Sequence, residues 1–81
     1  MAKTFHLTIA KIGENLFDGE ALSVTLPGAE GVFTVMSGHE AFVTPLRVGE
    51  ARIKSLEGED TTIAIEGGIA EVSGNQTTVL L

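Results

Sequence analysis

The chain has 81 residues, a formal net charge of −6 and 43% hydrophobic residues. This length accommodates one small domain without a cleft between domains, and the apolar content excludes a disordered chain. Eleven acidic residues against five basic ones, with four phenylalanines as the only aromatic residues, argue against a nucleic-acid partner. Because cysteine is absent, disulfides, iron–sulfur clusters and thiolate zinc sites are excluded.

The sequence shows neither a secretory signal nor a membrane-spanning segment. Residues 1–6 lack the apolar run of a signal peptide. No stretch approaches the roughly 20 consecutive apolar residues that a membrane helix needs. We therefore expect a soluble chain, made in a reducing compartment and able to dock on a membrane complex.

The first predicted strand follows from alternation over residues 4–10. Phe5, Leu7 and Ile9 lie on one face, and the other face carries threonines and His6. A period of two residues is typical of a strand with one buried face.

Glycine and proline divide the rest of the chain into short segments. Residues 22–26 alternate in the same way, and Pro27-Gly28 predicts a turn that residues 29–31 extend. An acidic hairpin tip is predicted over residues 57–60. The remaining predicted strands are 32–36, 42–46, 50–56, 61–65, 69–72 and 77–81. Seven or eight short strands without a convincing helix predict an all-β sandwich or barrel, with residues 1–81 as a single domain.

Two histidines are the only groups suited to acid–base or metal chemistry near neutral pH. His6 lies on the polar face of its strand, which favours a solvated side chain. His39 follows Gly38 in a predicted turn, where a local hydrogen bond or a partner contact is favoured over a metal site. No serine has the context of a nucleophile, and residues 57–60 lack the ligand ladder of a calcium loop. We expect no catalytic residue, no metal and no cofactor.

Two apolar segments lie close to the predicted turn at His39. Residues 32–36 and 41–43 carry more apolar bulk than a thin sandwich readily buries. The sequence leaves two interpretations open, a core and a docking surface.

Seven segments in register along the chain resemble the epsilon subunit of F-type ATP synthase, in its N-terminal β-sandwich domain. They are Leu-Phe-Asp-Gly at 16–19, Leu-Pro-Gly-Ala-Glu-Gly at 26–31, Ser-Gly-His-Glu at 37–40, Val-Thr-Pro-Leu at 43–46, Val-Gly at 48–49, Gly-Gly-Ile-Ala-Glu-Val at 67–72 and Thr-Val-Leu at 78–80. The family usually has two further prolines in the segment that matches residues 37–42, so the local contact geometry differs here.

The resemblance implies a flattened β-sandwich of about 8–10 short strands. It also implies a non-catalytic rotor subunit of a proton-translocating bacterial enzyme, peripheral to the cytoplasmic face of the inner membrane. The implied partners are the gamma subunit and the c-ring. The expected c-ring contacts are Ala29, Glu30, Gly31 and Val32, and the expected gamma contacts are Gly38, His39, Ala41 and Phe42.

Two further expectations come from the resemblance and from its main competitor. Longer members of the family carry an inhibitory helical hairpin after this domain, so a chain that ends at Leu81 predicts coupling without inhibition.

The alternative from another class is a biotinyl or lipoyl carrier domain, which needs a lysine on a tight hairpin. Lys54 lies between Ile53 and Ser55, away from the predicted turn, and Lys11 lies between Ala10 and Ile12. A small metal-dependent enzyme is a third class.

Overall fold

The computed structural model describes residues 3–81, and strands account for all of its regular structure. Within these residues, no helix is long and apolar enough to cross a membrane. The strands are β1 (Phe5–Lys11), β2 (Glu14–Ala21), β3 (Ser23–Gly28), β4 (Gly31–Met36), β5 (His39–Leu46), β6 (Gly49–Lys54), β7 (Asp60–Ile65), β8 (Gly68–Gly74) and β9 (Gln76–Leu80). The predicted all-β class is confirmed.

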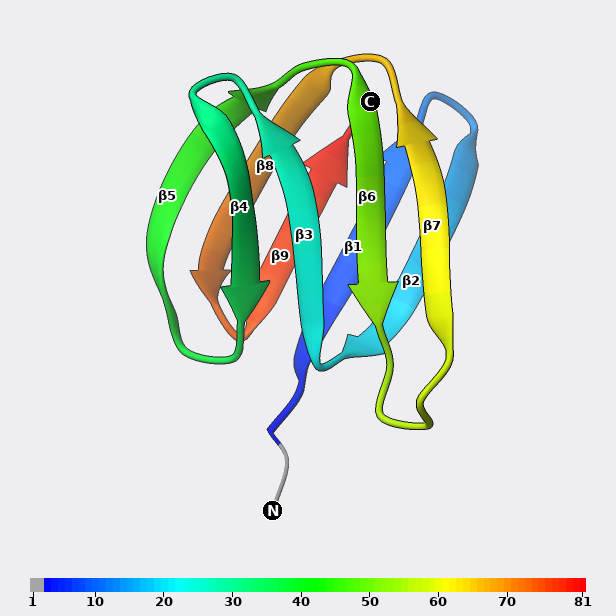
Figure 1. Ribbon diagram of the computed structural model, residues 1–81, viewed down its shortest axis with the longest axis vertical. Helices are drawn as coiled ribbons and strands as arrows, with labels where there is room; N and C mark the ends of the chain where they lie inside the picture. Colours follow the sequence, from blue (N-terminus) through cyan, green and yellow to red (C-terminus); the bar gives the residue numbers. More distant parts are fainter. Residues whose placement is uncertain (1–2) are drawn as a thin grey trace.

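The strands form two facing layers (Figure 1). The front layer contains β4, β3, β6 and β7, and the rear layer contains β5, β8, β9, β1 and β2. Neighbouring strands run antiparallel except β1 and β9, which pair in parallel. The layers meet at one corner, where Gly28 of β3 pairs with Leu46 of β5. The molecule measures 34 × 24 × 20 Å, so the sandwich is flattened.

The core lies between the two layers and is filled by the inward side chains of both. Phe5, Leu7 and Ile9 are buried, as their alternation predicts. The other buried apolar residues are Ala21, Val24, Leu26, Val35, Leu46, Ala51, Ile53, Ile65, Ala70, Val72 and Val79. Each strand therefore contributes one face to a single core.

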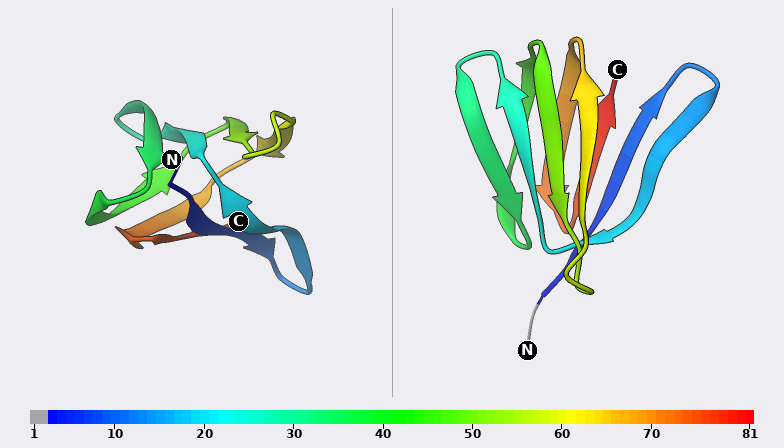
Figure 2. Two further views of the ribbon diagram at one scale, coloured as in Figure 1. Left: turned by 90° about the horizontal axis from the view of Figure 1, so that it is seen from below. Right: turned by 45° about the vertical axis from the view of Figure 1, so that its right-hand side comes forward.

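Strand β2 is the element that the sequence pattern misses. It is an edge strand paired only with β1, and the pairing register shifts between Ile9 and Ala10. This bulge places Leu16 and Phe17 in succession against the core, so the strand shows no clean alternation. Figure 2 shows the β1–β2 hairpin leaning away from the other strands.

The turn predicted at Pro27-Gly28 is wrong in position. Both residues belong to β3, and the turn consists of Ala29 and Glu30 alone. Pro27 fits in the strand because its carbonyl oxygen accepts a hydrogen bond from Arg47 N at 2.9 Å, a bond that needs no proline N–H.

Thr77 is the one polar residue buried completely among the described residues. Its Oγ1 has no hydrogen-bond partner there. A buried hydroxyl without a partner carries a desolvation cost that a methyl group of the same shape does not.

We predict that Thr77→Val keeps or raises the free energy of unfolding, by up to about 1 kcal/mol, because it removes this cost. Urea denaturation measures the change. The control is Val79→Thr on the same strand, which buries a new hydroxyl and should destabilise the fold. A loss of stability in Thr77→Val would mean that the hydroxyl does find a partner in solution.

Candidate functional site

Strands β4 and β5 are consecutive in the chain but lie in opposite layers. At one end, Ala29 N donates to Pro45 O at 2.9 Å and ties the β3–β4 turn to β5. At the other end, the two strands are joined by the short turn Ser37-Gly38, whose Ser37 Oγ donates to Asn75 Oδ1 at 3.0 Å. Between these ends no ladder pairs β4 with β5 in the described residues. The strands therefore bow apart and leave an opening.

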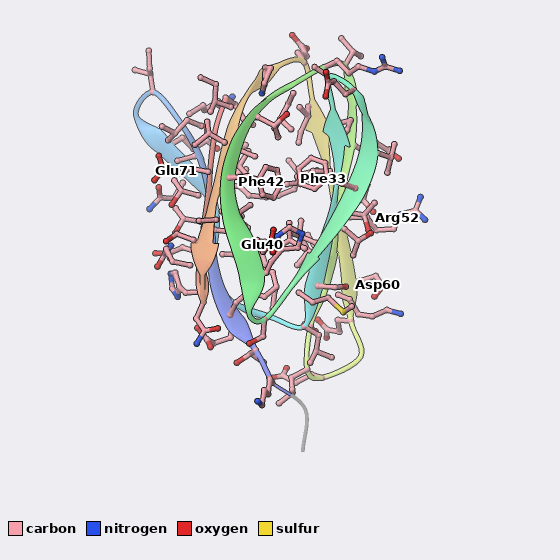
Figure 3. All side chains as sticks on the ribbon, turned by 90° about the vertical axis from the view of Figure 1, so that its left-hand side faces the viewer. Phe33, Glu40, Phe42, Arg52, Asp60 and Glu71 are labelled. Carbon is pink, nitrogen blue, oxygen red and sulfur yellow. The ribbon has the colours of Figure 1, made fainter. Side chains whose placement is uncertain are left out.

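This opening is a groove of about 470 Å³, which we call the β4–β5 groove. Phe33 of β4 and Phe42 of β5 point toward one another across it (Figure 3). Their ring centroids are 5.3 Å apart with an interplanar angle of 68°, an edge-to-face arrangement. The groove is lined by Gly28, Glu30, Gly31, Val32, Phe33, His39, Phe42, Val43 and Thr44.

The groove brings together residues from both predicted contact sets. Glu30, Gly31 and Val32, expected at the c-ring, lie at its upper end in the view of Figure 1. His39 and Phe42, expected at the gamma subunit, lie on β5. Ala29 belongs to the β3–β4 turn, Gly38 to the β4–β5 turn and Ala41 to β5. The six residues of β4 separate the two turns by roughly 20 Å.

His39 is the first residue of β5 rather than a turn residue. Its Nδ1 lies 2.9 Å from Glu40 O, which confirms the local hydrogen bond that the sequence favours. Its ring lies 5.1 Å from the ring of Phe42, centroid to centroid. The imidazole therefore covers one end of the aromatic pair and stays half-exposed to a partner.

The apolar segments beside the groove divide between core and surface. Val35 is buried, and Phe33 and Phe42 are half-buried. Val32 and Met36 are 74% and 58% exposed, and they lie on the same face of β4 on either side of Thr34. The core interpretation is thus correct for Val35 and partly correct for Phe33 and Phe42, while a docking surface at Val32 and Met36 stays a prediction.

The charge of the groove is acidic. Exposed Glu30, in the β3–β4 turn, lines the groove, and exposed Glu40 lies beside it on β5, below the phenylalanines in Figure 3. Among the described residues, neither lysine nor arginine lines the groove. A partner that covers it is favoured if it brings positive charge.

A second acidic site lies on the outer face of the rear layer, and sequence reasoning missed it. His6 Nε2 is 2.6 Å from Asp18 Oδ1, and His6 Nδ1 is 3.3 Å from Glu20 Oε2. Thr4 Oγ1 also donates to Glu20, at 2.8 Å. His6 is therefore held between two carboxylates rather than merely solvated. Only a prediction of strand β2, which the sequence pattern misses, could have indicated this site. The pairing of β2 with β1 places Asp18 and Glu20 opposite β1.

The hydrogen bonds to these carboxylates raise the pKa of His6, the bond to Asp18 most and that to Glu20 next. A raised pKa in the folded state means that protonated His6 favours folding. This contribution is complete below the unfolded pKa, about 6.5, and is lost as the pH rises through the folded pKa.

Among residues 3–81, no three His, Asp or Glu side chains are grouped as metal ligands. A further hollow of about 420 Å³ on the opposite side contains none of the predicted residues; it is lined by Lys11, Leu16, Ala64, Glu66, Gly67 and Leu81. The β4–β5 groove combines a half-exposed aromatic pair with an acidic side chain at one end.

Gly28 is required where the groove meets the core. A Cβ atom at this position would lie 2.7 Å from Gly31 O and 2.9 Å from the ring of Phe33. We predict that Gly28→Ala lowers the free energy of unfolding by about 1–3 kcal/mol, because backbone and ring must both move. Gly19→Ala is the control, since its Cβ would meet only a Phe17 ring carbon at 3.9 Å. Equal urea midpoints for the two variants would contradict this packing.

An NMR titration of the His6 ring tests the carboxylate pair. We predict a pKa above the ordinary value of about 6.5, lowered by Asp18→Asn more than by Glu20→Gln because the Asp18 bond contributes most. Asp60→Asn, in the β6–β7 hairpin, should leave the titration unchanged. A wild-type pKa at or below the ordinary value would show that His6 is free in solution.

Comparison with known proteins places the chain in one family. Residues 4–81 match the family model described as ATP synthase, Delta/Epsilon chain, beta-sandwich domain. The ATP synthase epsilon chain of Desulforapulum autotrophicum is 38% identical over 80 residues, which are 99% of this chain and 59% of that protein. The epsilon chain of Chlorobium limicola is 37% identical over 78 residues, 96% of this chain and 89% of that protein.

Solved structures show the same fold. A chain in the cryo-EM structure of Euglena gracilis mitochondrial ATP synthase (OSCP/F1/c-ring) aligns with a TM-score of 0.89 and 24% identity, covering 95% of this chain and 49% of that one. A chain of the Tetrahymena thermophila mitochondrial ATP synthase central stalk/c-ring aligns with a TM-score of 0.76 and 13% identity, over 96% and 63%.

The length of the match limits what these relatives imply. The chain spans about three-fifths of the length of the Desulforapulum relative, so the similarity concerns one domain of that protein. Within that domain the match is continuous, since the family model covers all but the first three residues. The chain therefore belongs to the family of ATP synthase delta/epsilon chain β-sandwich domains.

Proposed function

We propose that the chain is a non-catalytic central-stalk subunit of a proton-translocating F-type ATP synthase. It docks the gamma subunit onto the c-ring and couples rotation to ATP synthesis. It is peripheral to the cytoplasmic face of the bacterial inner membrane, where it is held by these partners. The observation that carries the proposal is the family match over residues 4–81.

The positions of the two contact sets support a docking role. The c-ring set surrounds the β3–β4 turn, and the gamma set begins at the β4–β5 turn, so they lie toward opposite ends of β4. The end that carries Glu30 also presents Ile12 and Val48, two of the most exposed apolar side chains. Covering such exposed apolar side chains removes apolar surface from water, which favours a contact at this end.

The sandwich suits the transmission of torque. Strands β4 and β5 are each paired along their length with a neighbour, β3 and β8 respectively. A load applied at the β3–β4 turn is therefore carried into both layers by ladder hydrogen bonds and by the Gly28–Leu46 corner. The two contact sets move as one body.

The carrier-domain alternative receives no support from the comparisons. Lys54 is the last residue of β6, and its hairpin tip is formed by residues 55–59. Lys11 lies 3.6 Å from Glu14 in an exposed ion pair at the end of β1. Neither lysine occupies the tip that a swinging cofactor arm requires.

We predict that the purified chain binds the gamma subunit of its source organism and that the pair binds the isolated c-ring. His39→Ala should raise the Kd for gamma at least about tenfold, because it removes the ring that covers Phe42. Calorimetry or surface plasmon resonance measures the Kd. Glu57→Gln at the hairpin tip is the control and should leave it unchanged.

Two results would count against the proposal. The first is a wild-type chain that does not bind gamma at micromolar concentration. The second is a gamma subunit that assembles on the c-ring equally well when this chain is omitted. An unchanged Kd for His39→Ala alone would instead remove His39 from the interface and leave the rotor role standing.

A further inference from the structure

Strand β4 is an edge strand with an unusual lack of protection. It pairs with β3 on one side, and no strand pairs with its other side in the described residues. Its six residues, Gly-Val-Phe-Thr-Val-Met, contain neither a charge nor a proline, and the register with β3 runs without a bulge. Natural sheets usually block such an edge, because its free backbone groups invite another strand.

The free backbone groups of β4 can be assigned from its pairing. Pro27 has no N–H, so the Pro27–Val32 pair cannot exchange both hydrogen bonds of an antiparallel ladder. Along an antiparallel ladder, hydrogen-bonded residue pairs alternate with non-hydrogen-bonded pairs. Thr34 and Met36 are two and four residues after Val32, so they too belong to non-hydrogen-bonded pairs. These three residues therefore direct their N–H and C=O groups to the open edge. Outside the ladders, none of the backbone hydrogen bonds of residues 3–81 involves them.

The other three edges carry the protection that β4 lacks. Strand β5 contains Pro45 and an irregularity between His39 and Phe42. Strand β2 carries three acidic residues and the bulge opposite Ile9. Strand β7 begins at Asp60 and adjoins the acidic hairpin tip. Charges, prolines and bulges are the usual devices against strand addition, so the open edge of β4 is the exception.

The charges beside β4 indicate what kind of segment fits. Glu30 precedes the strand and Glu40 follows it after the turn, and both are exposed. The outward side chains of Val32 and Met36 are apolar and exposed between these two acids. A complementary segment has apolar side chains in its middle and Lys or Arg near both ends.

We propose that β4 accepts an extended segment of the gamma subunit, about five or six residues long, as an added strand of the front layer. The segment covers the β4–β5 groove, pairs its backbone with Val32, Thr34 and Met36, and places cationic side chains beside Glu30 and Glu40. This inference rests on the proposed function and specifies the mode of the gamma contact, which it extends along β4 from the gamma set to Val32 and Glu30 of the c-ring set.

A second copy of the chain fits the same edge less well. Antiparallel pairing of two β4 strands about Thr34 brings Glu30 of one copy toward residues 38–40 of the other, which include Glu40. Like charges then meet at both ends, in a chain of net charge −6. A cationic segment turns the same two positions into favourable contacts.

Amide hydrogen exchange in the complex with gamma tests the added strand directly. We expect exchange at Val32, Thr34 and Met36 to slow at least about tenfold when gamma binds, because their N–H groups gain acceptors. The amides of Asp60 and Thr62, at the β7 edge of the same layer, are the internal reference and should not change. Protection that instead rises with chain concentration, without gamma, would assign the edge to a second copy and overturn the proposal.

A pair of proline variants provides the second test. Thr34 pairs with Thr25, Thr25 with Arg52, and Arg52 with Thr62, so Thr34 and Thr62 lie in one row at opposite edges. Thr34→Pro removes one outward N–H and should raise the Kd for gamma at least about tenfold. Thr62→Pro removes the matched N–H at the other edge and should leave the Kd within about twofold of wild type.

One more variant separates the amide from the side chain. Thr34 Oγ1 lies 3.0 Å from Thr25 Oγ1, and Thr34→Ala removes this hydroxyl contact but keeps the N–H. Its Kd for gamma should stay at least about fivefold below that of Thr34→Pro. Circular dichroism establishes whether each variant is folded. If a variant does not fold, the hydrogen-exchange measurement on the wild-type chain still tests the proposal.

The outcomes distinguish this inference from the function on which it rests. Wild type that binds gamma without added protection at Val32, Thr34 and Met36 would overturn strand addition and keep the rotor role. A folded Thr34→Pro variant that binds gamma like the wild type would also overturn strand addition and keep the rotor role. A wild-type chain that does not bind gamma at all would overturn both strand addition and the rotor role.

Discussion

The junction of the two layers depends on backbone contacts at the end of β3. Gly28 pairs with Leu46, Ala29 N donates to Pro45 O, and Arg47 N donates to Pro27 O. These bonds require the backbones of β3 and β5 to come close where the chain turns, and a Cβ atom at Gly28 would strike both Gly31 O and the Phe33 ring. The absence of a side chain at Gly28 therefore lets β4 fold closely over the end of β3, directly beside this corner.

Closing the corner at one end determines what happens along β4 and β5. The two strands are tied at both ends yet belong to different layers, so the ladder hydrogen bonds are missing between them. Phe33 and Phe42 fill this gap with an edge-to-face contact and remain half-buried. The place where the sandwich lacks backbone pairing is thus also the place where it presents aromatic surface, so the residues that close this gap include those of the proposed gamma contact.

Much of the fold was predictable because alternation is strong wherever both neighbours of a strand are present. Strand β1 lies between β2 and β9, and its buried Phe5, Leu7 and Ile9 alternate without interruption. Edge strand β2 was not predictable, because a bulge disrupts the alternation of its apolar and polar residues. Its Asp18 and Glu20 contact His6 on the outer face and do not face the core. Alternation reports burial, and an edge with one neighbour and a solvated face gives a weak signal.

The candidate site was predictable in its residues but not in its geometry. The resemblance supplied Glu30 and His39, while nothing local in the sequence indicates that residues nine positions apart line one groove. Pro27 misled in a similar way, since proline and glycine together predict a turn. Here the proline lies in the strand, and its missing N–H decides which side of β4 is bonded and which is free.

The spacing of the two proposed contact sets follows from the pairing of β4 with β3. A paired strand has a nearly fixed rise per residue, about 3.3 Å, so the two turns that flank β4 cannot approach or separate without breaking the ladder to β3. A loop in the same place would lack these ladder bonds and could change its end-to-end length under load. A subunit that must keep one partner in register with another gains from contact sets at the two ends of a strand. If the free edge of that strand also carries a partner segment, binding adds a second ladder to β4 and holds the same spacing more firmly.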